Sequence, residues 1–235
     1  MRLLRHLTWA TLALALAAGF AMLGFWQAGR GVEKQRWLEG HAAALASPAR
    51  ALAPVLAEPP SPLPVRVEGT LRLRPAPLLL LDNQQREGRV GVRAYALGDV
   101  EGATRPLLVE LGWLPLGPER VLPQVAVPQM PQTIAGMLLA WPGQGIRAAP
   151  NPWNGEVVLL TYIDRDEISR AAAADLYPGL LQPDPALPLG YLRDAGSLPN
   201  TLPPERHRGY AVQWWGLSIT VIIIYLILAW RRSVA

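Results

Sequence analysis

The side chains best suited to chemistry lie just before the C-terminal apolar stretch of the chain. His207, Tyr210 and Trp214 are spaced three and four residues apart, which places them on one face of a helix. Arg206 and Arg208 flank the histidine. An imidazole can ligate a metal ion, aromatic rings can cover an apolar ligand, and guanidinium groups can pair with carboxylates. Only three histidines occur in the chain, and His207 is the one that stands in such a cluster.

A second stripe of the same character follows the N-terminal apolar stretch. It consists of Trp26, Arg30, Lys34 and Trp37, at helical spacing. If the two helices pack side by side, a histidine, aromatic rings and several cations meet at one level. One interpretation is an interfacial belt, in which Trp and Tyr lie at head-group depth and Arg or Lys reach lipid phosphates. The other is a porphyrin site, because haem iron binds an axial imidazole and haem propionates pair with cations.

The rest of the chain offers little chemistry. His6 belongs to the opposite membrane face, and His41 is expected to be solvated on a helical extension. With no cysteine, disulfides and thiolate chemistry are excluded. Asp82-Asn83 is interpreted as a turn and the acidic residues 164–167 as a helix start, since no base accompanies them. We therefore expect no enzyme. A membrane-tethered enzyme acting on lipid or envelope substrates would need a titratable cluster that the sequence lacks.

The two apolar stretches predict membrane-spanning helices, because each exceeds the about 20 residues that cross a bilayer. We expect the first at residues 7–29 and the second, with its lead-in, at residues 203–231. A secretory signal peptide is the alternative for the first, since Ala15-Leu16-Ala17 resembles a cleavage site. Basic residues near both termini favour the cytoplasm for residues 1–6 and 232–235, although nearly as many cations lie at the other ends. Without an Arg- and Ser-rich leader, a bacterial inner membrane is expected.

Between the spans, the pattern changes from helical to strand-like. Residues 30–64 predict a helical extension followed by an extended Pro-rich linker, in which the prolines exclude helix. Residues 65–202 predict a β-rich periplasmic domain with a small antiparallel sheet or barrel. Its expected strands are 65–68, 71–73, 78–81, 90–97, 107–114, 134–141 and 157–162. Asp164 and Glu167 predict the start of one soluble helix that runs to Leu176.

The expected fold class is thus an α+β membrane protein, with two transmembrane helices flanking this β-rich extramembrane domain. Period-2 alternation predicts that Glu110 faces solvent and Leu111 the core. Ala13, Ala17, Ala21 and Gly24 are small residues through which the spans could pack. The net charge of +4 fits contact with lipid head groups, and no nucleic-acid motif accompanies it.

Several short motifs, taken in order, resemble the Surfeit locus protein 1 family of membrane-anchored cytochrome oxidase assembly factors. They are Leu23-Gly24-Phe25-Trp26-Gln27 with Arg30 and Lys34, Val67-Glu68-Gly69, residues 82–91, residues 107–115, and His207 with Tyr210-Ala211 and Trp214. The resemblance covers essentially the whole chain. One departure is that Glu110-Leu111 stands where the family usually has Asn-Arg, so any contact made by that arginine is missing.

The resemblance implies a function that the residues alone leave open. It implies an assembly factor without turnover that binds or delivers haem a for a haem-copper oxidase near the outer membrane surface. His207 would then ligate the haem iron. Arg206, Arg208 and Arg30 would pair with the propionates, and Tyr210, Trp214 and Trp26 would form the walls. The implied partners are oxidase subunits, the lipid bilayer and the enzyme that synthesises haem a. The alternative is a haem-independent chaperone that clamps nascent oxidase subunits.

Overall fold

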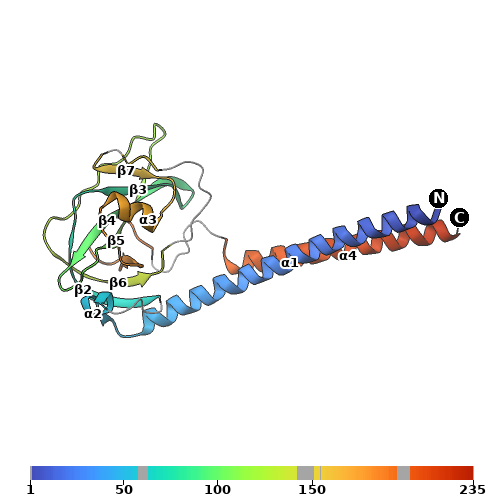
Figure 1. Cartoon of the computed structure of the whole chain (residues 1–235), viewed down its shortest axis with the longest axis horizontal. Coiled ribbons are helices and arrows are strands. Elements are labelled where there is room, and N and C mark those ends of the chain that lie inside the picture. The colour runs from blue at the N-terminus through green and yellow to red at the C-terminus, as the bar shows by residue number, and fades with distance from the viewer. Residues whose placement is uncertain (1, 58–62, 142–150, 154, 195–201, 235) are drawn as a thin grey trace. The chain divides into compact units, whose positions relative to one another are not determined.

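The protein consists of a helix pair and a sheet unit in a computed structural model that describes residues 2–57, 63–141, 151–153, 155–194 and 202–234. Met1–Glu39 and Thr201–Ala235 form the helix pair, and Gly40–Asn200 forms the sheet unit. Figure 1 shows the two long helices and the strands of the sheet unit.

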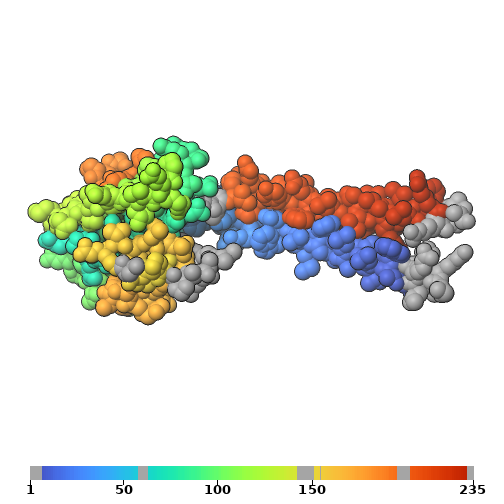
Figure 2. All heavy atoms as spheres, turned by 90° about the horizontal axis from the view of Figure 1, so that it is seen from above, coloured from blue at the N-terminus to red at the C-terminus, as the bar shows by residue number. Residues whose placement is uncertain are grey.

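The helix pair is built from α1 (Arg2–Ala46), of which residues 2–39 belong to this unit, and α4 (Pro204–Val234). The helices run side by side in both views (Figures 1 and 2). Their direction is antiparallel, since Ser218 contacts Ala17 while His207 contacts Gln27, and both chain ends lie at the same end of the pair. Pro204 opens α4, where its fixed φ suits the first helical turn.

Small residues at heptad spacing form the seam between the two helices. Ala17, Gly24 and Gly31 recur every seven residues on α1 and are buried. Pro204, Ala211 and Ser218 recur at the same interval on α4, with the first two buried. Such a repeat keeps one stripe of each helix facing its partner, and small residues allow close approach. Ala17 and Gly24 are thus in contact with the second helix, as the sequence predicts.

Outside this seam, the helices expose apolar side chains. Large hydrophobic residues such as Leu14, Met22, Phe25, Ile219 and Leu226 are between 57% and 71% exposed. Both helices are long and apolar enough to cross a membrane. Apolar surface on this scale requires a lipid environment. The predicted class, an α+β membrane protein with two spanning helices around a β-rich domain, is confirmed.

The sheet unit contains eight strands among the described residues. These are β1 (Arg50–Ala51), β2 (Val65–Leu73), β3 (Leu78–Arg86), β4 (Arg89–Val100), β5 (Leu107–Pro115), β6 (Gln132–Leu139), β7 (Val157–Leu160) and β8 (Leu180–Pro183). Pairing runs from β2 through β6, β8, β5 and β4 back to β2, which closes a five-stranded barrel. The predicted barrel is present, although the sheet is not antiparallel throughout, because β1–β2, β3–β7 and β5–β8 are parallel.

The main core includes residues that the sequence assigned to an extended linker. A short helix, α2 (Leu52–Ala57), buries Leu52, Val55 and Leu56 against barrel residues. The prediction that prolines exclude helix throughout this linker is therefore wrong. Pro54 is the third residue of α2, so its missing N–H falls among the donors that have no intrahelical acceptor.

A second core packs on the opposite face of β3, β4 and β5. Its members include Leu79, Leu97 and Leu108, and α3 (Arg165–Ala171) covers them with Ile168. Asp164 caps α3 as predicted, its carboxylate accepting from the backbone N–H of Glu167 at 3.0 Å. The helix ends at Ala171, earlier than the sequence indicates.

Glu110 does not face solvent, and this prediction is wrong. Glu110 is only 2% exposed. Its carboxylate lies 3.4 Å from Nη1 of Arg93 and accepts a 3.0 Å hydrogen bond from the side-chain amide of Gln182. Leu111 points to the core as expected. Both faces of β5 are buried. Glu110 meets Arg93 and Gln182, whereas Leu111 faces the apolar core, so alternation along this strand does not separate solvent from core.

Candidate functional site

His207 lies in the seam of the helix pair, near the start of α4. Its Nδ1 is 2.7 Å from Oε1 of Gln27 on α1, and the residue is only 8% exposed. An amide oxygen accepts hydrogen bonds and cannot donate them, so Nδ1 carries the proton in this contact. No hydrogen-bond partner of Nε2 occurs among the residues that the structure describes. The imidazole is therefore fixed through one nitrogen while the other keeps its lone pair.

Gly31 makes this close contact possible. A Cβ at this position would lie 3.4 Å from both the Cβ of His207 and the carbonyl oxygen of Pro204. Ala211, one turn after His207, is also buried in the seam. Small residues on both helices thus surround the histidine, and backbone packing sets its position relative to α1.

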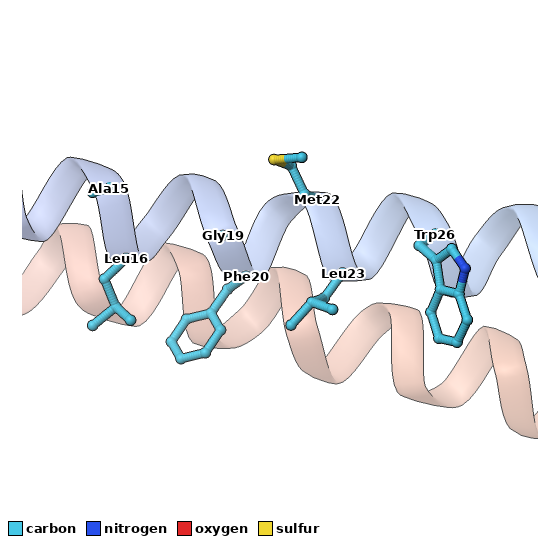
Figure 3. A pocket seen from close by; sticks show the side chains of 7 residues that line it. All are labelled: Ala15, Leu16, Gly19, Phe20, Met22, Leu23 and Trp26. Atoms are coloured by element: carbon cyan, nitrogen blue, oxygen red, sulfur yellow. The ribbon is translucent and has the colours of Figure 1, made fainter.

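The aromatic residues near His207 differ in their contacts and exposure. Trp214 packs against Phe20 of α1, with 5.6 Å between ring centroids, and Trp215 contacts Phe25 at 5.5 Å. Trp26 is 58% exposed and belongs to an apolar groove of about 580 Å³ along α1 (Figure 3). Tyr210 is 38% exposed. Of the expected walls, the structure brings Trp214 against α1 and leaves Trp26 and Tyr210 on the surface.

The expected cations also differ in their availability. Arg206 and Arg208 are exposed on either side of His207, and neither forms an ion pair within the described part of the chain. Arg30 instead pairs with Glu33 one turn further along α1, with 2.6 Å between Nη1 and Oε2. Two arginines are therefore free to meet an anionic group beside the histidine, while the third is already engaged.

Gln27 is the contact that sequence reasoning missed. It appeared only as the last residue of a motif, because the predicted stripe followed Trp26, Arg30 and Lys34 instead. Gln27 lies three residues after Gly24 and four before Gly31, which are seam positions. The heptad repeat of small residues was the signal that could have identified this face. His41 also departs from expectation, since it is buried at 5% exposure rather than solvated.

His207 can supply one ligand to a metal ion, so it suits a metal whose other ligands come from a bound cofactor. Within the described ranges, no three His, Cys, Asp or Glu side chains come together as a metal site. A porphyrin supplies four nitrogen ligands itself and needs only an axial residue from the protein. A tautomer with a hydrogen-bonded Nδ1 and a free Nε2 is the form in which histidine commonly binds metals. The residues around His207 thus fit a haem.

Fold and site together define a two-span membrane protein that carries a β-barrel domain between its spans. A family model for the SURF1 family matches residues 14–219, and the chain belongs to this family. Members are associated with cytochrome oxidase assembly and act as assembly factors rather than catalysts. The resemblance found in the sequence motifs is confirmed. A search of curated proteins gives no match.

Proposed function

We propose that the protein assists the assembly of a haem-copper oxidase by holding haem a beside His207 of its helix pair, at the outer surface of a bacterial inner membrane. The observation that carries this proposal is the geometry of His207. Its Nδ1 is held by Gln27, its Cβ lies against Gly31, and two arginines without an ion pair among the described residues flank it. Oxidase subunits and the enzyme that makes haem a are the proposed partners.

Each residue has a distinct task in this proposal. His207 would provide a nitrogen ligand to the haem iron, and Gln27 would keep the imidazole proton on Nδ1. Arg206 and Arg208 pair with propionates at the hydrated edge of the bilayer, where an ion pair contributes about 1 kcal/mol or less. Trp214 contributes an apolar wall. A bound haem a supplies the redox centre that the oxidase must receive, and the assembly factor itself transfers no electrons.

A second candidate function is a haem-independent clamp for nascent oxidase subunits. The observation in its favour is the same buried contact, because the Gln27–His207 hydrogen bond also ties α1 to α4. In this case, the histidine would serve helix packing, and the exposed apolar faces of the spans would receive subunit helices. Spectroscopy distinguishes the two functions.

The test is the visible spectrum of the full chain purified from cells that make haem a. We expect a Soret band in the wild type and its loss or marked shift in His207→Ala, with protein abundance nearly unchanged. Arg206→Ala and Arg208→Ala should weaken haem retention more mildly, and mature oxidase should fall in the same order. His41→Ala is the matched histidine control. Haem with an unchanged spectrum in His207→Ala would reject the ligand role and favour the clamp.

A further inference from the structure

Among the residues that the structure describes, Gln27 provides the polar side chain of α1 that contacts the histidine of α4. Its Oε1 accepts from Nδ1 of His207 across the seam at 2.7 Å. Both residues lie in the seam, at the level of the buried Gly24 and Gly31. His207 is buried and Gln27 half-buried, so the hydrogen bond is stronger than a solvent-exposed one. The proton is therefore confined to Nδ1 for as long as the two helices stay in register.

The hydrogen bond from His207 to Gln27 affects how the imidazole can bind a metal. A histidine ligand binds through one nitrogen, and the group that accepts from the other nitrogen sets the ring orientation and basicity. A stronger acceptor makes the imidazole more electron-rich and strengthens its bond to iron. A missing acceptor weakens that bond and frees the ring to rotate. The acceptor here comes from a different helix than the ligand, which couples ligation to helix packing.

We propose that Gln27 is a positioning residue that orients His207 and presents Nε2 to the iron of a haem bound by the helix pair. The inference rests on the proposed function. It goes further in assigning the tautomer, the ligating nitrogen and the helix that controls both. Gln27 touches neither iron nor porphyrin in this role, so its effect passes entirely through the imidazole.

The test uses the full chain, loaded with haem in detergent, and the iron–histidine stretching band in the resonance Raman spectrum of the ferrous form. Gln27→Met retains the approximate size of the side chain and removes the acceptor, so the band should shift to lower frequency. Gln27→Glu supplies a stronger acceptor, so the band should shift to higher frequency. Gln213→Met alters an exposed glutamine of α4 and should leave the band unchanged.

Opposite shifts in the two Gln27 variants would support the proposal, because a purely structural residue would not produce a change of sign. An unchanged band in both variants, with haem bound normally, would overturn the positioning role and leave the proposed function intact. A wild-type chain that binds no haem would overturn both. If Gln27→Met fails to insert, Gln27→Glu alone decides by the direction of its shift.

Discussion

At the scale of single residues, Glu110 is the group whose chemistry differs most from its sequence context. Burial raises the pKa of its carboxyl, and the nearby charge of Arg93 and the hydrogen bond from Gln182 only partly offset this effect. The folded protein therefore holds a proton at Glu110 more tightly than the unfolded chain does. Its contribution to stability is greatest below the unfolded pKa and is lost as pH rises through the folded pKa.

Replacement of Glu110 by Gln should remove this dependence on pH. The amide resembles the protonated carboxyl, so the wild type should lose stability relative to Glu110→Gln as pH rises from about 4 towards neutrality. Chemical unfolding of the full chain in detergent at several pH values would measure the difference. Glu119→Gln, at an exposed position, is the control. A difference that grows in the opposite direction would mean that the pairing with Arg93 outweighs burial.

The neighbouring residue allows a prediction about packing. Leu111 is fully buried in the barrel core, so Leu111→Ala should cost about 2–5 kcal/mol through lost apolar contact and a residual cavity. Hydrogen exchange of the β5 amides should accelerate accordingly. Leu192→Ala, at a position 54% exposed, should change exchange little. Comparable effects at the two positions would contradict the assignment of Leu111 to the core.

At the scale of elements, the sequence predicts regular features better than contacts between distant segments. Six of the eight strands among the described residues, β2 to β7, and the capped helix follow from periodicity and turn residues, which are local signals. The short strands β1 and β8 depend on pairing with distant segments, β1 with β2 and β8 with both β5 and β6, which no local pattern encodes. Glu110 is buried for the same reason, since Arg93 and Gln182 come from other strands.

In the candidate site, too, local patterns predict residues within one helix but not contacts between distant segments. Helical spacing identifies His207 and its arginines, because those residues share one element. Gln27 lies 180 residues away in sequence, and its role depends on the register of two helices. That register is set by the heptad of small residues, in which Gly24 leaves no room for a side chain beside the indole of Trp215.

Gly24 therefore offers a test of how the helices pack. Gly24→Leu should displace Trp215 and weaken the helix pair by about 1–3 kcal/mol, through overpacking of the seam. The measurement is the yield of crosslinking between cysteines introduced by Ala17→Cys and Ser218→Cys, in a chain that has no native cysteine. Gly19→Leu is the matched control, since nothing lies within 4 Å of a Cβ there. Equal yields in the two variants would show that the seam lies elsewhere.

At the scale of the whole molecule, the antiparallel helix pair constrains topology. Two spans that each cross once place residues 2–6 and 232–234 on one side of the membrane and the intervening sheet unit on the other. His207 and Gln27 then lie at the ends of the spans that lead to the sheet unit. The side on which that unit is found therefore decides which membrane surface presents the histidine.

The absence of cysteine from the native chain makes this orientation directly measurable. Val121→Cys places a thiol in the sheet unit at a residue that is 70% exposed, and a cysteine appended after Ala235 marks the C-terminus. In bacterial cells whose outer membrane has been permeabilised, a membrane-impermeant maleimide should label the first thiol at once. The appended thiol should react only after the inner membrane is disrupted, because the basic residues Arg231 and Arg232 favour retention in the cytoplasm. The reverse labelling pattern would put His207 at the cytoplasmic surface. Haem would then have to be held on the inner side, contrary to the proposed function.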